Sequence, residues 1–237
     1  MAVVLKATPV TFVAHALAAA CAVLVLVWCI SFRGGLAWEA TNKSLIFNIH
    51  PVLMLIGFII IGGEAIMSYK SLPLKKEVQK VIHLVLHAIA LALGIVGIIA
   101  AFKYHNESAI LNLYSLHSWL GIGIIVLYAI QNRKFKYHSE SECQKIRRGS
   151  ASLRSDSLPW HVIFGMFVYG LAIANAALGF LEKLTFLENS GLNKFGAEAY
   201  LVNFTAIATV LYGAAVMLTV YAQKEQEGDD YSYSSIN

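Results

Sequence analysis

Charged residues are scarce in this sequence of 237 residues: Asp, Glu, Lys and Arg make up 14% of it, against 58% for hydrophobic residues. Soluble globular chains carry about a quarter charged residues. The mean hydropathy of +0.64 is correspondingly high. A soluble domain of this composition would not stay in solution, so the sequence excludes that class of protein and indicates a membrane environment.

Cysteine and intramembrane acid are also rare. Of the 3 cysteines, Cys21 and Cys29 lie inside the first apolar run and Cys143 lies in a polar loop. No two of them share an oxidising compartment, so we expect packing residues and no disulfide. Glu64 is the one acidic residue within the apolar runs. No stripe of basic and aromatic residues lies in a soluble region, which argues against a nucleic-acid partner.

Several apolar runs are long enough to cross a membrane, because about 20 mostly apolar residues in a helix span a hydrocarbon core of roughly 30 Å. The first run exceeds the apolar part of a secretory signal, about 7 to 15 residues, so we expect a retained anchor. The sequence predicts an all-α integral membrane protein with six transmembrane helices: Val10–Ile30, Leu45–Tyr69, Val81–Phe102, Leu111–Ile130, Leu158–Leu181 and Tyr200–Ala222.

Basic residues predict the orientation, because Lys and Arg of short loops collect on the cytoplasmic side. With a cytoplasmic N-terminus, only five of the 18 Lys and Arg lie on the opposite side: Arg33, Lys43, Lys103, Lys183 and Lys194. We therefore expect both termini to be cytoplasmic. Residues 223–237 are polar and acidic, and we expect them to form a disordered cytoplasmic tail after a membrane domain of residues 1–222.

Histidines recur at matched depths in the predicted helices. Ionisable groups inside a membrane are costly, so each one is a candidate for a functional site. His50 and His117 lie near the non-cytoplasmic starts of the second and fourth helices, and His83 and His161 lie near the cytoplasmic starts of the third and fifth. Since consecutive helices run in opposite directions, two level pairs result, His50 with His117 and His83 with His161.

Each pair joins alternate helices of a bundle, between which a porphyrin can fit. Imidazole is a common axial ligand of haem iron, and two histidines leave no position open to oxygen or substrate. The pairs favour two electron-transferring haems, while a metal-ion site, a proton relay or unrelated polar contacts stay open. Gly121 and Gly165 each follow a histidine of a pair by four residues, where a flat ring can approach the backbone; ordinary helix packing explains them equally well.

Two further intramembrane histidines are assigned structural roles. His15 has no evident partner in the sequence, and we expect it to bond a carbonyl of a neighbouring helix. His87 follows His83 by four residues and faces the same side, but it lies about 6 Å deeper. We expect His83 to be the ligand and His87 to be a satisfied core histidine.

The cytoplasmic end carries basic side chains near one histidine pair. Lys76, Lys80, His83 and His87 share one helical stripe if the third helix extends beyond the membrane. There the lysines can balance haem propionates or attract a small anionic reductant, and burial beside each other would let one of them accept a proton. Snorkelling interfacial lysines are the alternative. Arg154, seven residues before His161, adds a further positive group.

The opposite end is aromatic and hydrogen-bonding. Tyr104, His105, Asn112 and Tyr114 lie around the start of the fourth helix. They can hold an oxidised sugar acid or a metal chelate, although interfacial tyrosines often form only a belt.

Four segments of the sequence resemble the cytochrome b-561 family of ascorbate-dependent transmembrane oxidoreductases, and its plant members in particular. The resemblance runs from about Thr11 to Tyr221. It implies a central bundle of the second to fifth helices that holds two b-type haems, with His50, His117, His83 and His161 as axial ligands. The matching segments are Asn48-Ile-His-Pro51, Lys80-Val-Ile-His83 with His87, Leu113-Tyr-Ser-Leu-His-Ser-Trp119 and Leu158-Pro-Trp-His161.

The resemblance also implies a reaction. Cytoplasmic ascorbate gives up an electron and a proton near Lys76, Lys80 and Arg154, with Lys80 as a catalytic residue. The electron then crosses both haems to monodehydroascorbate or a ferric chelate at a site made by Tyr104, His105, Asn112 and Tyr114, where His105 is the catalytic residue. A vacuolar or other endomembrane is the expected location, and exposed aromatic side chains would permit a homodimer.

The segment Asn132–Ser157 departs from the family pattern. Counted from its histidine, the fourth helix continues 13 residues to Ile130, whereas the second and third continue 19. Snorkelling of basic side chains can let the fourth helix continue through Tyr137; alternatively, an altered splice product or gene model replaced its end. The rival functions are a metal-ion transporter or metal-binding membrane protein, and a family member inactivated by this segment.

Overall fold

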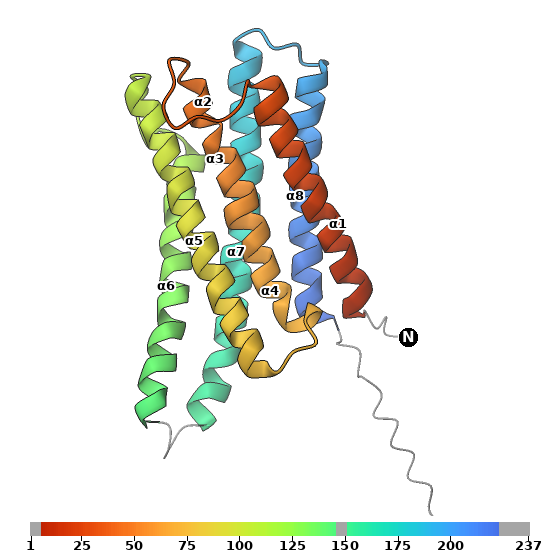
Figure 1. Cartoon of the computed structure of the whole chain (residues 1–237), viewed down its shortest axis with the longest axis vertical. Coiled ribbons are helices and arrows are strands. Elements are labelled where there is room, and N and C mark those ends of the chain that lie inside the picture. Colours follow the sequence, from red (N-terminus) through yellow and green to blue (C-terminus); the bar gives the residue numbers. More distant parts are fainter. Residues whose placement is uncertain (1–5, 146–150, 223–237) are drawn as a thin grey trace, which may run out of the picture.

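The structure is a computed structural model that describes residues 6–145 and 151–222, with side chains described for 6–132 and 158–222. The predicted tail, residues 223–237, lies outside the described residues. Over the described ranges the chain forms helices and no β-strand element. Figure 1 shows the long helices side by side in one upright bundle.

The helices follow one another as the apolar runs predict, and two of the crossings include π-helical turns. Pro51, in α3, lies two residues before the longer π-helical stretch and has no N–H to donate to the preceding turn. The elements are α1 Ala7–Val27 with η1 Trp28–Phe32; α2 Ser44–Phe47, α3 Ile49–Val52, η2 Leu53–Ile60 and α4 Ile61–Ser71; α5 Lys76–Glu107; α6 Leu116–Lys145; α7 Ala151–Asn189; and α8 Ala197–Tyr221.

Five of these crossings are long and apolar enough to span a membrane, and the apolar part of α6, Leu116–Asn132, is shorter. The prediction of six helices is confirmed, but the predicted ends of the fourth and fifth helices are wrong. Leu111–Ser115 lies in a loop, where Leu113 has the left-handed φ of 55° that ends a helix.

The polar segment after the fourth apolar run is also largely helical. Of the two explanations left open for this segment, the structure agrees with a fourth helix that continues through Tyr137, since α6 runs to Lys145; α7 begins at Ala151, seven residues before the predicted Leu158. Helices extend into polar sequence because their backbone hydrogen bonds do not depend on hydropathy. Cys143 and Arg154 lie within residues 133–157, whose side chains are outside the described set.

The topology places the predicted pairs at matching levels. α1 begins and α8 ends at the lower end of Figure 1, where the chain also turns from α4 to α5. α5 packs on α4 and η2, α6 packs on α7, and α1 packs outside this group against α8 and α4. The second to fifth crossings therefore form the central bundle that the histidines require.

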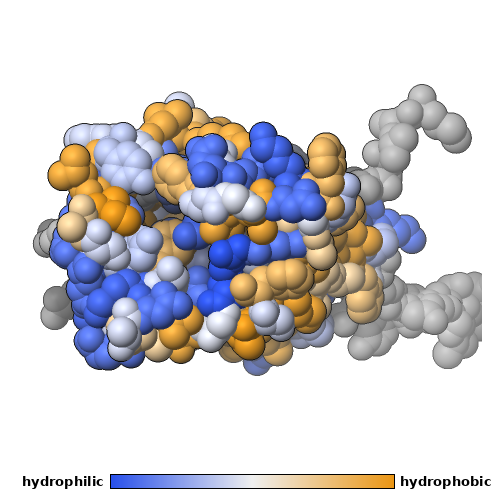
Figure 2. Space-filling model, turned by 90° about the horizontal axis from the view of Figure 1, so that it is seen from above, coloured by the Kyte–Doolittle hydropathy of each residue, from blue (hydrophilic) through white to orange (hydrophobic). Residues whose placement is uncertain are grey.

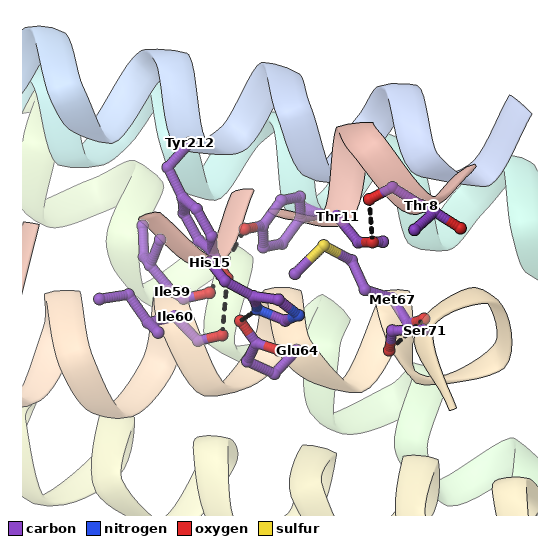
Figure 3. Close-up of polar contacts among 10 residues, drawn as sticks. Thr8, Thr11, His15, Ile59, Ile60, Glu64, Met67, Ser71 and Tyr212 are labelled. Carbon is purple, nitrogen blue, oxygen red and sulfur yellow. Dashed lines mark hydrogen bonds and ion pairs between the residues drawn. The ribbon is translucent and has the colours of Figure 1, made fainter. Parts of the chain in front are cut away.

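α4 is fixed to its neighbours by polar contacts within the membrane (Figure 3). His15 Nδ1 of α1 lies 3.0 Å from Glu64 Oε1 of α4. The expected partner of His15 was a backbone carbonyl, so that prediction is wrong: the partner is a carboxylate from a neighbouring helix. The Tyr212 hydroxyl donates to the Ile60 carbonyl at 2.9 Å, and Gly63 is needed because a Cβ there would come within 3 Å of this hydroxyl.

The cysteines behave as predicted where they are described: Cys21 and Cys29 are buried and free. The end face at which α5 and α7 finish is rich in hydrophilic residues (Figure 2). Ion pairs neutralise most cations at this end, among them Lys103 with Glu39 at 2.8 Å and Lys43 with Glu107 at 2.7 Å.

Candidate functional site

The first histidine pair lies between the second and fourth crossings. The rings of His50 on α3 and His117 on α6 have centres 6.1 Å apart. His50 Nδ1 lies 3.0 Å from the Gly97 carbonyl and His117 Nδ1 lies 2.9 Å from the Asn175 carbonyl. A carbonyl only accepts hydrogen bonds, so each Nδ1 carries the proton and each Nε2 keeps a lone pair for a metal.

The second pair lies between the third and fifth crossings. The rings of His83 on α5 and His161 on α7 have centres 6.3 Å apart. His83 Nδ1 donates to the Ala65 carbonyl at 2.8 Å. His161 Nδ1 instead faces a side chain, Gln131 Nε2, at 2.8 Å, and the same amide nitrogen donates to the His161 carbonyl at 2.9 Å.

Both pairs fit a single metal ion held between two imidazoles. With metal–nitrogen distances of about 2 Å, imidazoles on opposite sides of one ion have ring centres about 6 Å apart, as observed in both pairs. Ligation by His161 Nε2 requires its Nδ1 to carry the proton, so the Gln131 amide must turn its oxygen toward the ring in place of the nitrogen and give up its bond to the His161 carbonyl. The donor set, two neutral imidazoles, is one that haem iron takes.

A cavity of about 520 Å³ adjoins the His50 and His117 pair. This volume lies in the range of pockets that hold cofactors and small molecules. Gly179 on α7 is needed there, because a Cβ would lie 2.7 Å from the His117 ring. Asn175 Oδ1, buried without a hydrogen-bond partner, belongs to the same wall.

The predicted glycines have different surroundings. Gly121 lines this cavity, and a Cβ there would lie 3.2 Å from Asn175 Nδ2; the corresponding atom at Gly165 would lie 3.5 Å from Gln131 Nε2. Both therefore face side chains next to a histidine of a pair, and the approach of a flat ring stays a prediction.

The predicted acceptor residues come together at the mouth of the cavity. Tyr104, His105, Asn112 and Tyr114 all line it. His105 Nδ1 lies 3.2 Å from Asn112 Oδ1, and its ring centre lies 5.7 Å from that of Tyr104 and 6.1 Å from that of Tyr114. Burial, with Glu182 and Tyr104 nearby, raises the pKa of Tyr114, so its hydroxyl stays protonated and can donate.

The predicted donor residues are placed less completely. Lys76 and Lys80 lie on the first turns of α5, which begins five residues before the predicted Val81, so the condition for one stripe with His83 is met. Both are exposed, so the mutual burial that would let one of them accept a proton is absent, and they are solvated cations. The side chain of Arg154 lies outside the described residues.

Two side-chain contacts were not predicted from the sequence. The first joins His87 to the Tyr128 hydroxyl of α6; it confirms the expected core role of His87 and identifies its partner. Gln131 also went unnoticed, although its place immediately after the last apolar residue of the fourth run was a usable signal. Among the described residues, no three His, Cys, Asp or Glu side chains converge as a metal-ion site.

Comparisons with known proteins agree with the geometry. The family model for eukaryotic cytochrome b561 matches residues 49–187, a range that holds all four paired histidines. The chain is 63% identical to transmembrane ascorbate ferrireductase 1 of Arabidopsis thaliana over all of both chains. It is 60% identical to the probable ascorbate-specific transmembrane electron transporter 1 of Oryza sativa subsp. japonica, over 98% of this chain and 97% of the relative.

A more distant relative covers nearly as much of the chain. Transmembrane ascorbate ferrireductase 2 of Arabidopsis thaliana is 40% identical over 92% of this chain and 93% of its own. Similarity of this extent, together with the family model and the helical bundle, shows that the chain belongs to the eukaryotic cytochrome b561 family.

Proposed function

We propose that this protein is a transmembrane oxidoreductase that carries single electrons from cytosolic ascorbate to monodehydroascorbate or a ferric chelate on the other side. One haem b is held by His83 and His161 near the cytoplasmic end, and a second by His50 and His117 near the opposite end. Both termini face the cytosol. The membrane is vacuolar or another endomembrane, and exposed aromatic side chains such as Trp119 and Trp160 suit a homodimer.

One observation carries the proposal: two histidine pairs lie at the two ends of one helical bundle, with ring centres 6.1 Å and 6.3 Å apart. Relatives named for ascorbate-dependent electron transfer, which the chain matches over nearly its whole length, support the same reaction. Their names do not favour a metal-ion transporter.

The paired histidines determine the type of chemistry. Haem, when bound, supplies a one-electron couple. His50 with His117, and His83 with His161, would each hold one haem and would leave no ligand position open to oxygen or substrate. Backbone carbonyls fix three of the four rings in the tautomer that ligation needs. The bundle thereby favours electron transfer over oxygen chemistry or substrate ligation.

The two ends bind different partners. At the cytoplasmic end, Lys76 and Lys80 present positive charge that attracts the ascorbate anion, and we place Arg154 with them. At the opposite end, His105 is held by Asn112 and flanked by Tyr104 and Tyr114, which provide ring faces and hydrogen bonds for the acceptor. His105 can pass a proton to a reduced acceptor through a ring nitrogen.

Vesicles test this proposal directly. Proteoliposomes loaded with ascorbate should reduce external ferric citrate, and His50→Ala and His83→Ala should each abolish the reduction. His50→Ala should remove chiefly the non-cytoplasmic haem, and His83→Ala the other, in visible spectra. Loss of both haems from a still folded His50→Ala protein would contradict independent sites, and reduction at the wild-type rate in either variant would contradict the route.

A further inference from the structure

Lys183 differs from the other basic residues at the non-cytoplasmic end. It is the one lysine or arginine among the residues that line the 520 Å³ cavity. Within the described part of the chain, no carboxylate lies within ion-pair distance of it. A cation at a cavity wall needs compensation when water is displaced, so the cavity is expected to receive an anionic group.

The nearby carboxylates are already occupied. Glu198 binds Arg33 and also accepts a hydrogen bond from Trp28 Nε1 at 3.0 Å. Glu182, which precedes Lys183, accepts a hydrogen bond from the Ser115 hydroxyl at 3.2 Å. These bonds leave acceptor sites on Glu182, but neither acid forms a direct ion pair with Lys183 among the described residues.

The ammonium group is held by an aromatic ring. Lys183 Nζ lies 4.1 Å from the centre of the Phe47 ring of α2. A cation over a ring face keeps N–H donors for other partners, because an ammonium group has three of them. The contact therefore positions Lys183 without satisfying its hydrogen bonds.

The position of Lys183 on α7 connects it with the haem ligand. Asn175, Gly179 and Lys183 are spaced by four residues and so share one stripe of the helix. The Asn175 carbonyl accepts from His117 Nδ1, and Gly179 lies against the His117 ring. Lys183 follows one turn, about 6 Å, farther toward the mouth of the cavity.

We propose that Lys183 is an anion-binding residue of this cavity and takes a carboxylate or enolate oxygen. The anion is either a haem propionate or a small anionic redox partner, because both present such an oxygen. The proposal rests on the proposed function only for the identity of the anion. The other premises do not depend on the proposed function: Lys183 is positively charged, it lies at the cavity wall, and the nearby carboxylates have other partners.

Two substitutions test the charge. Lys183→Met removes it at similar length, and Lys183→Arg retains it. Each purified protein is reduced with ascorbate and mixed rapidly with ferricyanide, an anion, or hexaammineruthenium(III), a cation. If Lys183 binds the redox partner, Lys183→Met should slow oxidation by ferricyanide about tenfold, the usual effect of a lost charged hydrogen bond. Oxidation by hexaammineruthenium(III) should not slow, and Lys183→Arg should resemble the wild type.

A propionate partner gives a different result. Lys183→Met should then lower the midpoint potential of the non-cytoplasmic haem, because the lost positive charge no longer favours the reduced state, and both oxidants should respond alike. Unchanged potential, haem content and oxidant ratio in Lys183→Met would overturn the proposal. Equal impairment of Lys183→Met and Lys183→Arg, without charge dependence, would also overturn it and leave only packing.

A measurement whose readout does not depend on haem distinguishes this proposal from the proposed function. Citrate should raise the unfolding temperature of the wild type and not that of Lys183→Met. A wild-type protein that binds no haem but is stabilised by citrate would contradict the proposed function and support the anion site. A wild-type protein that carries two haems while Lys183→Met behaves normally in all assays would contradict only the anion site.

Discussion

At the residue scale, the site depends on which nitrogen of each histidine is free. His50, His83 and His117 direct Nδ1 to backbone carbonyls at 2.8–3.0 Å, so no side-chain substitution removes these partners directly. His161 alone of the four relies on a side-chain amide, that of Gln131. A substitution at Gln131 can therefore change the basicity of the His161 ligand, whereas no single side chain controls the basicity of the other three histidines in this way.

Gln131 should tune the haem that we propose between His83 and His161. In Gln131→Glu a carboxylate accepts from His161 Nδ1–H, which raises the basicity of the ligand, stabilises ferric iron and lowers the midpoint potential of this haem. Gln131→Leu leaves Nδ1 without this partner and should weaken haem binding by about tenfold or more. Potentiometric titration followed in the visible spectrum measures both effects.

The other haem is the internal control for this prediction. Its potential should stay at the wild-type value in both variants, because His50 and His117 bond the backbone carbonyls of Gly97 and Asn175 and not Gln131. Equal shifts of the two haems, or no shift in Gln131→Glu, would show that Gln131 does not act through His161.

At the element scale, sequence reasoning located the crossings better than their ends. Apolar length identifies a crossing because lipid imposes it. The ends of α6 and α7 lie in polar sequence, where backbone hydrogen bonds continue a helix without an apolar signal. The contact between His15 and Glu64, 49 residues apart, also escaped prediction, because it depends on how α1 is rotated against α4.

This contact predicts that substitution of His15 and substitution of Glu64 destabilise the protein by different amounts. The side chains are 45% and 30% exposed, so the pair lies between a surface and a buried ion pair. His15→Leu leaves a carboxylate without its partner in the membrane and should destabilise the protein by about 1–3 kcal/mol, whereas Glu64→Leu leaves an imidazole ring and should cost less. Thermal unfolding in detergent measures the two effects.

The double variant is the decisive comparison for this pair. His15→Leu with Glu64→Leu removes both polar groups and should be more stable than His15→Leu alone. Strictly additive losses would mean that the two side chains do not interact.

At the scale of the whole molecule, the two ends are chemically different. The end that we propose to be cytoplasmic presents exposed lysines at the start of α5, and the opposite end presents a cavity lined by His105 and Lys183. Matching depths in antiparallel helices were enough to predict both histidine pairs. Their supporting residues, Gln131 and Asn175, were not predicted, because rotation about a helix axis cannot be read from apolar length.

A substitution of Lys80 tests whether the end of the bundle at the start of α5 binds the electron donor. Lys80→Ala removes an exposed positive charge that we propose attracts the ascorbate anion, so reduction by ascorbate should slow by about three- to tenfold while haem content stays constant. Stopped-flow spectra measure the rate. Lys75→Ala, an exposed lysine just before α5, is the matched control and should have a smaller effect. An unchanged rate in Lys80→Ala would remove this lysine from the donor site.

The number of haems bound per chain tests the central claim most directly. Full-length protein purified in detergent should give two haems b per chain by pyridine haemochrome and protein assay, and ascorbate should reduce them in the visible spectrum. This result would also show that the polar segment Asn132–Ser157 preserves both sites. A protein that binds no haem when haem is supplied, or whose haems ascorbate does not reduce, would contradict the account.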